Sequence, residues 1–82
     1  MHILIIGAAG MIGRKLTSAL LKSGQVGGKA ISKFTLTDVV EPAKIAFNGD
    51  VTTVVSDVSL PGEAAKLIAS RPDLIFHLAA IV

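Results

Sequence analysis

Three glycines at regular spacing stand near the start of this 82-residue sequence. They are Gly7, Gly10 and Gly13, and two alanines follow Gly7. A phosphate can approach a backbone closely only where side chains are absent or very small, and this run provides such a stretch. An apolar run precedes the glycines and a helical pattern follows, so the positive end of a helix would face the anion. This context favours a pyrophosphate-binding turn, and the alternative is a tight turn that binds nothing.

A carboxylate, Asp38, closes the second apolar run of the chain, 25 residues beyond Gly13. The usual spacing in dinucleotide sites is about 20, and the long segment 24–33 explains the excess. A carboxylate at this point accepts hydrogen bonds from both ribose hydroxyls. It also repels a 2′-phosphate, by about 4 kcal/mol per unit charge at 4 Å and an effective dielectric of 20. The residues after it are valines, so the pattern predicts NAD rather than NADP, with a merely solvated Asp as the alternative.

Three further residues carry groups that could act in a site. Asp57 ends the third apolar run next to Val58, where its carboxylate could accept from the adenine amine and the Val58 N–H could reach a ring nitrogen. An equally weighted alternative is that Asp57 caps the turn before Ser59. His77 is chemically a natural acid or base, but it stands in an apolar run without an evident partner, so we expect a structural histidine or one that faces the opposite side of the strand. We expect no role for His2.

Two helices and four strands must position these residues. Short apolar runs predict strands at 2–6, 34–37, 51–55 and 74–78. A helix over 11–22 has apolar residues at helical spacing and ends at Gly24. The stripe of this helix consists of Ile12, Leu16, Ala19 and Leu20.

The second helix and the connecting segments follow from turn residues. Ser59 stands where an N-cap would, Pro61 suits a first turn, and Pro72 ends a helix that reaches Arg71. We expect a surface loop at 24–33 and an irregular connection at 41–50. The order β-α-β-β-α-β predicts an α/β fold of the Rossmann type, a doubly wound parallel sheet.

The composition excludes several classes of protein. Hydrophobic residues make up 51% of the chain and its mean hydropathy is +0.70, yet no apolar run is long enough to cross a membrane and the start is not a secretory signal. The net charge is only +2 and the chain lacks Trp and Tyr, which disfavours nucleic acid as a partner. The absence of cysteine excludes thiolate metal sites and is compatible with a cytoplasmic location.

The high apolar content indicates strands that are buried on both faces, as in a larger α/β protein. The sequence ends four residues beyond the fourth strand, on the apolar segment 79–82. A sheet that ended there would have an uncovered apolar edge. We therefore expect residues 1–82 to be the N-terminal part of an NAD-binding Rossmann domain, with the remaining strands and a substrate domain absent.

The glycine turn, Asp38, Asp57-Val58 and the segment 77–80 together resemble the extended short-chain dehydrogenase/reductase family, its NAD-dependent epimerase/dehydratase group. The resemblance covers essentially the whole chain. It implies that Met11 and Ile12 offer backbone N–H groups to the pyrophosphate and that small residues after Leu78 adjoin the nicotinamide ribose. The cofactor-binding residues that it implies are Gly7, Ala9, Gly10, Met11, Ile12, Gly13, Asp38, Asp57, Val58, Leu78, Ala79 and Ala80.

The chain departs from the family in one respect, since it contains no tyrosine. The family's chemistry uses a Tyr-x-x-x-Lys pair with a Ser or Thr, so the resemblance implies a longer parent enzyme and an inactive fragment. That parent would be a homodimer that oxidises a secondary alcohol of a sugar acid with NAD, and it would use no metal. The alternatives are a nucleotide-sugar epimerase or dehydratase and a non-catalytic NAD-binding module.

Overall fold

A computed structural model of the chain describes residues 1–43 and 45–78. Its main sheet has four strands in the order β5-β4-β1-β6, and every neighbouring pair is parallel. The strands are β1 (His2–Ile6), β4 (Lys33–Asp38), β5 (Asp50–Val55) and β6 (Leu74–His77). The central place of β1, with later strands added on both of its sides, confirms the predicted Rossmann-type arrangement.

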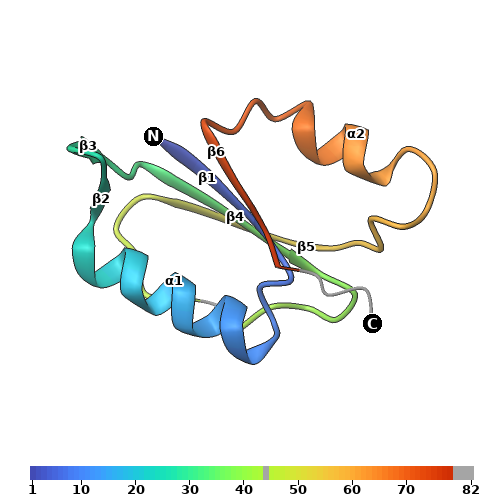
Figure 1. The fold of residues 1–82 in the computed structure, drawn as a ribbon, viewed down its shortest axis with the longest axis horizontal. Coiled ribbons are helices and arrows are strands. Elements are labelled where there is room, and N and C mark those ends of the chain that lie inside the picture. The colour runs from blue at the N-terminus through green and yellow to red at the C-terminus, as the bar shows by residue number, and fades with distance from the viewer. Residues whose placement is uncertain (44, 79–82) are drawn as a thin grey trace.

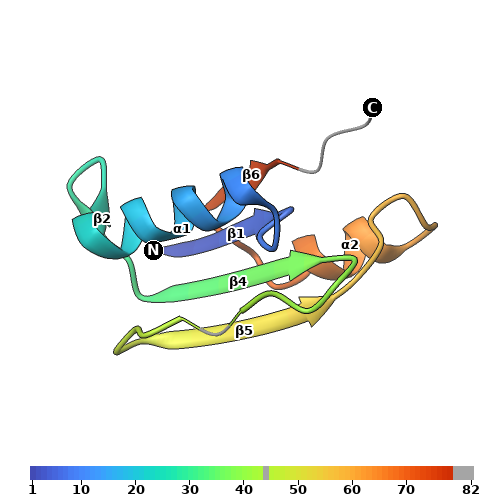
Figure 2. The same cartoon turned by 90° about the horizontal axis from the view of Figure 1, so that it is seen from below.

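Two helices cover opposite sides of this sheet. Figure 1 shows α1 (Met11–Ser23) on one side and α2 (Glu63–Ile68) on the other, and Figure 2 shows α1 running along β1. The strand β1 is buried on both faces, as its continuous apolar run predicts, and Ile3, Leu4 and Ile5 are each 0% exposed. The core on the α1 side consists of Ile3, Ile5, Ala8, Leu20, Ile31, Phe34 and Leu36.

The buried face of α1 agrees with the predicted stripe at Leu20, which is buried, and at Leu16, which packs against the core, but differs from it elsewhere. Its buried residues are Gly13, Thr17 and Leu20, whereas Ile12 is 70% exposed and Ala19 is exposed as well. The helix is rotated because Gly13, which has no side chain, packs against Gly7 and Ala8 of the turn that follows β1. The buried hydroxyl of Thr17 donates a hydrogen bond to the Gly13 carbonyl at 2.7 Å. The end of the helix is as predicted, with Gly24 in the left-handed region at φ 71°.

Segment 24–33 is not a plain loop. It contains a small antiparallel hairpin of β2 (Gln25–Val26) and β3 (Lys29–Ala30). Gly27 and Gly28 both have positive φ, at 56° and 82°, and a two-residue hairpin turn of type I′ requires this combination. Each strand has two residues, which is too short for an alternating pattern to be visible in the sequence.

The second helix is shorter than predicted at both ends. It begins after Gly62, which has a φ of 83°, and ends at Ile68, so Pro61 and Arg71 lie outside it. Ser59 does not cap it, because its hydroxyl donates to the Asp57 carboxylate at 2.6 Å. Strands β4 and β5 each begin one residue earlier than predicted, and β6 ends one residue earlier, at His77.

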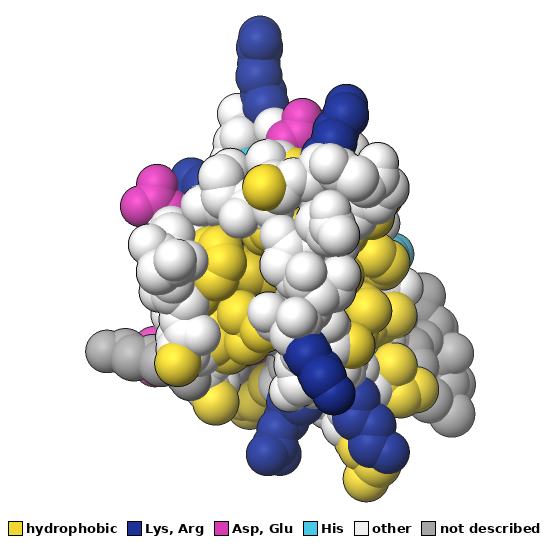
Figure 3. All heavy atoms as spheres, turned by 90° about the vertical axis from the view of Figure 1, so that its left-hand side faces the viewer, with side chains coloured by type: hydrophobic (Ala, Val, Ile, Leu, Met, Phe, Trp, Pro, Cys, Tyr) yellow, Lys and Arg dark blue, Asp and Glu magenta, His cyan; other side chains and the backbone are white. Residues whose placement is uncertain are grey.

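The strand β6 is an edge of the four-stranded sheet. Leu74 and Phe76 pack against the core, while Ile75 on the other face is 42% exposed. Figure 3 shows a band of apolar side chains at the end of the molecule that carries the N-terminus, with Lys and Arg side chains near it. Within residues 1–43 and 45–78, no helix has the length and apolar character that a membrane span requires.

His2, for which we expect no role in the site, does not line the groove described below, and its side chain belongs to the interior. His2 is 9% exposed and its Nε2 forms a 2.7 Å hydrogen bond with the Thr35 hydroxyl on the neighbouring strand. Its backbone N–H donates to the Asp73 carboxylate at 2.7 Å. Burial, and to a lesser degree the nearby Lys33, lowers the pKa of the imidazole below 6.5, and Asp73 partly opposes this. The residue therefore has a structural contact in the interior, and its burial favours the neutral imidazole.

This histidine predicts how the stability of the chain depends on pH. Because the unfolded chain binds the His2 proton more readily than the folded chain does, the free energy of unfolding should decrease as pH falls below 6.5. Hydrogen bonds lower the pKa values of Asp57 and Asp73, so their contribution is lost only in more acidic solution, as pH falls below 3.8. Urea unfolding between pH 7.5 and 5.5 should show the first decline, and His2→Gln should flatten it. An unchanged slope in this variant would contradict the assignment.

Candidate functional site

The turn between β1 and α1 is held against the end of β4. The Gly7 and Ala8 N–H groups both donate to the Thr37 carbonyl, at 2.9 and 3.0 Å, and the Gly10 N–H donates back to the Gly7 carbonyl at 3.3 Å. Gly7 has a φ of 93°, a conformation that favours glycine. The turn therefore has a fixed backbone path.

The contacts around Gly13 explain why a third glycine is needed one turn into the helix. A Cβ atom built on Gly13 would lie 2.2 Å from the Gly7 oxygen and 2.8 Å from the Ala8 Cα. Both neighbours are backbone atoms that belong to the pinned turn, so they cannot move aside as a flexible side chain would. The absence of a side chain at Gly13 thus lets α1 pack directly on the turn that follows β1.

The first turn of α1 leaves its backbone donors without side-chain partners. Gly10 is the N-cap residue, with an extended backbone at φ −74° and ψ 169°, and no side chain caps the helix. The first turn also contains no acidic residue. The N–H groups at such a helix start, together with the helix dipole, favour an anion.

Asp38 lies next to this turn although 29 residues separate it from Ala9. Its Oδ2 accepts a hydrogen bond from the Ala9 N–H at 2.9 Å, and its Oδ1 accepts one from the Val39 N–H at 2.7 Å. Asp38 ends β4, which lies beside β1 and runs parallel to it. The ends of the two strands therefore lie at the same edge of the sheet, and the carboxylate lies beside the turn that follows β1. An acidic group and a helix start thus lie on one side of the molecule.

A groove of about 480 Å³ joins these elements. Seven of the residues proposed from the sequence meet in it, together with Val39, which sequence reasoning missed. Val39 directly follows Asp38 and is 62% exposed, and this exposure at a strand end is the signal that could have identified it. The groove is lined by Gly7, Gly10, Met11, Ile12, Gly13, Asp38, Val39 and Leu78.

The groove has the features that a dinucleotide requires. Its floor is the glycine turn, where a Cβ on Gly10 would contact only the Gly7 oxygen, at 3.6 Å, so the space above it is open. The lining includes the start of α1, where no side chain caps the N–H groups, and the Asp38 carboxylate. A pyrophosphate fits the first and a ribose diol fits the second.

Of the other sequence-predicted residues, Ala9 lies in the turn itself, where its N–H donates to the Asp38 carboxylate. Asp57 and Val58 follow β5 and do not line the groove. The Asp57 Oδ1 accepts hydrogen bonds from the Ser59 hydroxyl at 2.6 Å and from the Ser59 N–H at 2.9 Å, and both lower the Asp57 pKa. The capping role considered for Asp57 is therefore present. Ala79 and Ala80 lie outside the described residues.

His77 ends β6 with its side chain exposed, so it belongs neither to the core nor to the lining of the groove. In the part of the chain that the structure describes, no three His, Cys, Asp or Glu side chains are grouped as a metal site would need. The chemistry that the groove itself supports is binding of a phosphorylated ribose compound.

Comparison with known sequences agrees with this geometry. The sequence model of the NAD dependent epimerase/dehydratase family matches residues 3–82. Over 86 aligned positions, the chain is 37% identical to D-erythronate dehydrogenase of Cupriavidus necator, covering 100% of this chain and 26% of that protein. It is 38% identical to the Haemophilus influenzae enzyme of the same name, covering 100% of this chain and 25% of that protein. The chain thus spans about a quarter of the length of these relatives.

Two solved structures contain the same arrangement. A nucleoside-diphosphate-sugar epimerase from Agrobacterium tumefaciens superposes with a TM-score of 0.95 at 61% identity, covering 100% of this chain and 24% of that one. A uronate dehydrogenase from the same organism, a tyrosine-to-alanine variant complexed with NAD, superposes with a TM-score of 0.72 at 25% identity, covering 99% of this chain and 27% of that one.

Proposed function

Because this chain belongs to the NAD dependent epimerase/dehydratase family, we propose that it is the N-terminal, cofactor-binding part of a longer oxidoreductase. The cofactor of the family is NAD. The observation that carries the proposal is the groove in which the glycine turn, the start of α1 and Asp38 meet. Coverage of only a quarter of the relatives' length supports a division in which the remaining part binds substrate.

Each part of the groove has a proposed task. The N–H groups of Met11 and Ile12 hold the pyrophosphate, and Gly7, Gly10 and Gly13 keep side chains away from it. Asp38 accepts hydrogen bonds from the adenosine ribose, and its charge repels a 2′-phosphate. When bound, NAD supplies the acceptor for a hydride from a substrate alcohol. The residues of this chain hold the cofactor in place, and proton transfer falls to the tyrosine that the family uses and this chain lacks.

We propose that the substrate of the whole enzyme is a sugar acid such as D-erythronate. The two D-erythronate dehydrogenases, at 37% and 38% identity, support this choice. A nucleotide-sugar epimerase is the second candidate, favoured by the 61% identity to a protein of that name. The two activities differ in their net chemistry, since a dehydrogenase accumulates NADH and an epimerase returns the hydride to its substrate.

Absorbance of NADH therefore separates the candidates. The full-length protein, incubated with NAD and D-erythronate, should accumulate NADH. An epimerase would interconvert a nucleoside-diphosphate sugar without net NADH, and failure with every four-carbon sugar acid would exclude the narrower proposal. A non-catalytic module would show neither reaction and would lack Tyr-x-x-x-Lys after residue 82.

Replacement of Asp38 tests the cofactor site itself. Asp38→Ala should weaken NAD binding about 10- to 100-fold, because hydrogen bonds to a charged group contribute about 1.5–3 kcal/mol. Asp38→Asn should cost less, since its amide oxygen still accepts from the Ala9 N–H. An NMR titration of the ¹⁵N-labelled chain with NAD measures both affinities, and the amide signals of residues 7–13 should shift. Equal NAD affinity in the wild type and both variants would contradict the assigned role.

A further inference from the structure

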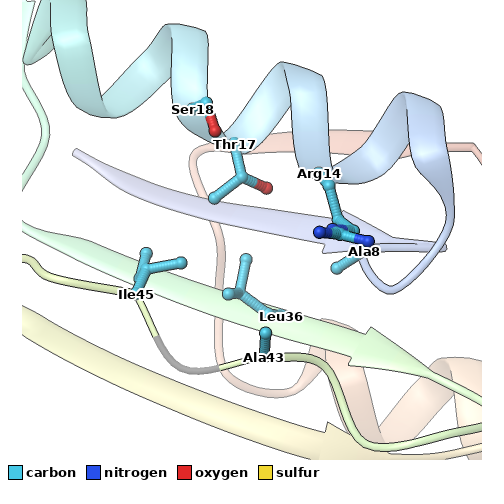
Figure 4. Close-up of a pocket in the computed structure, with 7 residues that line it drawn as sticks. All are labelled: Ala8, Arg14, Thr17, Ser18, Leu36, Ala43 and Ile45. Carbon is cyan, nitrogen blue, oxygen red and sulfur yellow. The ribbon is translucent and has the colours of Figure 1, made fainter.

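The glycine turn between β1 and α1 is held in two different ways along its length. In its first half, Gly7 and Ala8 donate both N–H groups to the Thr37 carbonyl, and the Ala8 side chain is buried. Figure 4 shows Ala8 and Leu36 of β4 facing the same space between α1 and β4, a hollow of about 100 Å³. Strand backbone and packing therefore fix this half of the turn.

The second half of the turn consists of Ala9, which is half-buried, and Gly10, which is exposed. The Gly10 N–H forms a long bond of 3.3 Å to the Gly7 carbonyl, whereas the Ala9 N–H donates to the Asp38 Oδ2 at 2.9 Å. In the part of the chain that the structure describes, Asp38 supplies the one side-chain hydrogen bond to residues 7–10. The shape of this half therefore depends on the Asp38 carboxylate.

The free N–H groups of α1 follow directly on this second half. Gly10 is the N-cap residue, and the first hydrogen bond of the helix runs from the Arg14 N–H to the Gly10 carbonyl at 2.9 Å. The N–H groups of residues 11–13 lie between them and have no carbonyl partner in the helix. Because the helix continues from Gly10, any rotation of the backbone at Ala9 and Gly10 changes the direction in which these N–H groups point.

We propose that Asp38 is a positioning residue for the diphosphate of the cofactor, in addition to binding its ribose. The inference rests on the proposed function of the groove. By fixing the Ala9 N–H, the carboxylate aims the N–H groups of residues 11–13 at the diphosphate. An ionised carboxylate has about four lone-pair sites. The N–H groups of Ala9 and Val39 occupy two of them, so sites remain for both ribose hydroxyls.

A ligand that has a diphosphate and no ribose separates the two tasks. If Asp38 only bound the ribose, its negative charge would merely repel inorganic pyrophosphate, and removal of the charge would leave pyrophosphate binding unchanged or tighten it. If Asp38 positions the turn, removal of the carboxylate should weaken pyrophosphate binding although the repulsion is relieved. The two possibilities therefore predict effects of different sign.

The experiment is an NMR titration of the ¹⁵N-labelled 82-residue chain with inorganic pyrophosphate. Leucine and asparagine at position 38 have nearly the same shape, but only asparagine offers an acceptor to the Ala9 N–H. Asp38→Leu should bind pyrophosphate about three- to tenfold more weakly than the wild type, because loss of a hydrogen bond to a charged group outweighs the relieved repulsion. Asp38→Asn keeps the acceptor and loses the charge, so it should bind at least as tightly as the wild type.

Glu41→Gln is the control for charge alone. Glu41 is exposed, stands three residues beyond Asp38 and forms none of the hydrogen bonds of the turn. Its removal should change pyrophosphate affinity less than about twofold, because solvent and salt screen an exposed charge.

Hydrogen exchange of the Ala9 amide tests the cause without any ligand. The exchange should become at least about tenfold faster in Asp38→Leu and stay near the wild-type rate in Asp38→Asn. The amides of β1 should remain protected in both variants, which shows that the fold persists. If Asp38→Leu unfolds the chain, Asp38→Asn decides alone, and pyrophosphate binding weaker than that of the wild type would then refute the positioning role.

The remaining outcomes separate this inference from the proposed function. A wild-type chain that does not bind NAD would refute the proposed function. Normal NAD binding, with pyrophosphate affinity in folded Asp38→Leu equal to or above that of the wild type, would refute the positioning role alone. Equal losses in Asp38→Leu and Asp38→Asn would refute it too, because the acceptor for the Ala9 N–H would then not matter. The same holds for a wild-type chain that binds NAD and no pyrophosphate, since a positioned turn should hold the diphosphate alone.

Discussion

Replacing Gly13 with alanine should destabilise the chain by about 3 kcal/mol, the upper end of the usual cost of overpacking. The added Cβ would lie 2.2 Å from the Gly7 oxygen and 2.8 Å from the Ala8 Cα. Those atoms are fixed because Gly7 and Ala8 both donate to the Thr37 carbonyl on β4. The helix α1 must then move away from β1, which reduces the burial of Leu20 and opens the core.

Thermal unfolding measures this effect. For a domain of this size, 1 kcal/mol corresponds to about 4–8 °C in Tm, so the Gly13→Ala variant should lose about 12–24 °C. Gly10→Ala is the matched control, because its Cβ would meet only the Gly7 oxygen, at an ordinary 3.6 Å. It should lose no more than about 1 kcal/mol, the preference of an N-cap position for glycine over alanine. Equal losses in the two variants would show that the packing at Gly13 is not special.

The parts of the fold that the sequence predicts well are those for which one physical cause dominates. The run from Ile3 to Ile5 is apolar without alternation. A strand needs an apolar residue at every position only when both of its faces are buried. Gly24 ends α1 because a left-handed residue is needed there. Gly7 and Gly13 mark the turn because a positive φ at the first and close packing at the second favour glycine.

Predictions failed where two causes competed for the same residue. Ser59 is a residue type that often caps a helix. Its hydroxyl instead donates a hydrogen bond to the Asp57 carboxylate two residues earlier, and α2 begins only after Gly62. Ile12 fits the apolar stripe of α1 by spacing. The contact of Gly13 with the turn rotates the helix, however, and leaves Ile12 exposed. Spacing alone cannot reveal which of two adjacent faces will meet the sheet.

Most residues that line the candidate groove could be named from the sequence, but Val39 and the contacts within the groove could not. The residue type and spacing of Asp38 predict a carboxylate that binds the ribose hydroxyls, and Asp38 lines the groove. Its hydrogen bond to the Ala9 N–H depends on the register of β1 and β4, which no local pattern specifies. This bond gives Asp38 a structural task in addition to the proposed binding task, so a change at Asp38 affects the glycine turn as well.

Replacing Gly10 with serine should separate stability from cofactor binding. Gly10 is the N-cap residue of α1 and has the extended backbone that a serine cap adopts. The serine hydroxyl would accept a hydrogen bond from the N–H of Ile12 or Gly13. The helix start would gain a partner that it now lacks, so the free energy of unfolding should stay equal or rise by a few tenths of a kcal/mol.

The same serine should weaken NAD binding more than tenfold. Its side chain would enter the groove above the glycine turn and occupy an N–H group that we assign to the pyrophosphate. Thermal unfolding without ligand and an NMR titration with NAD measure the two effects independently. A stable variant with unchanged NAD affinity would show that the start of α1 is not where the cofactor binds. A stable variant with weak binding would show that this helix is left uncapped for its ligand, since an anion takes the place that a capping side chain would otherwise fill.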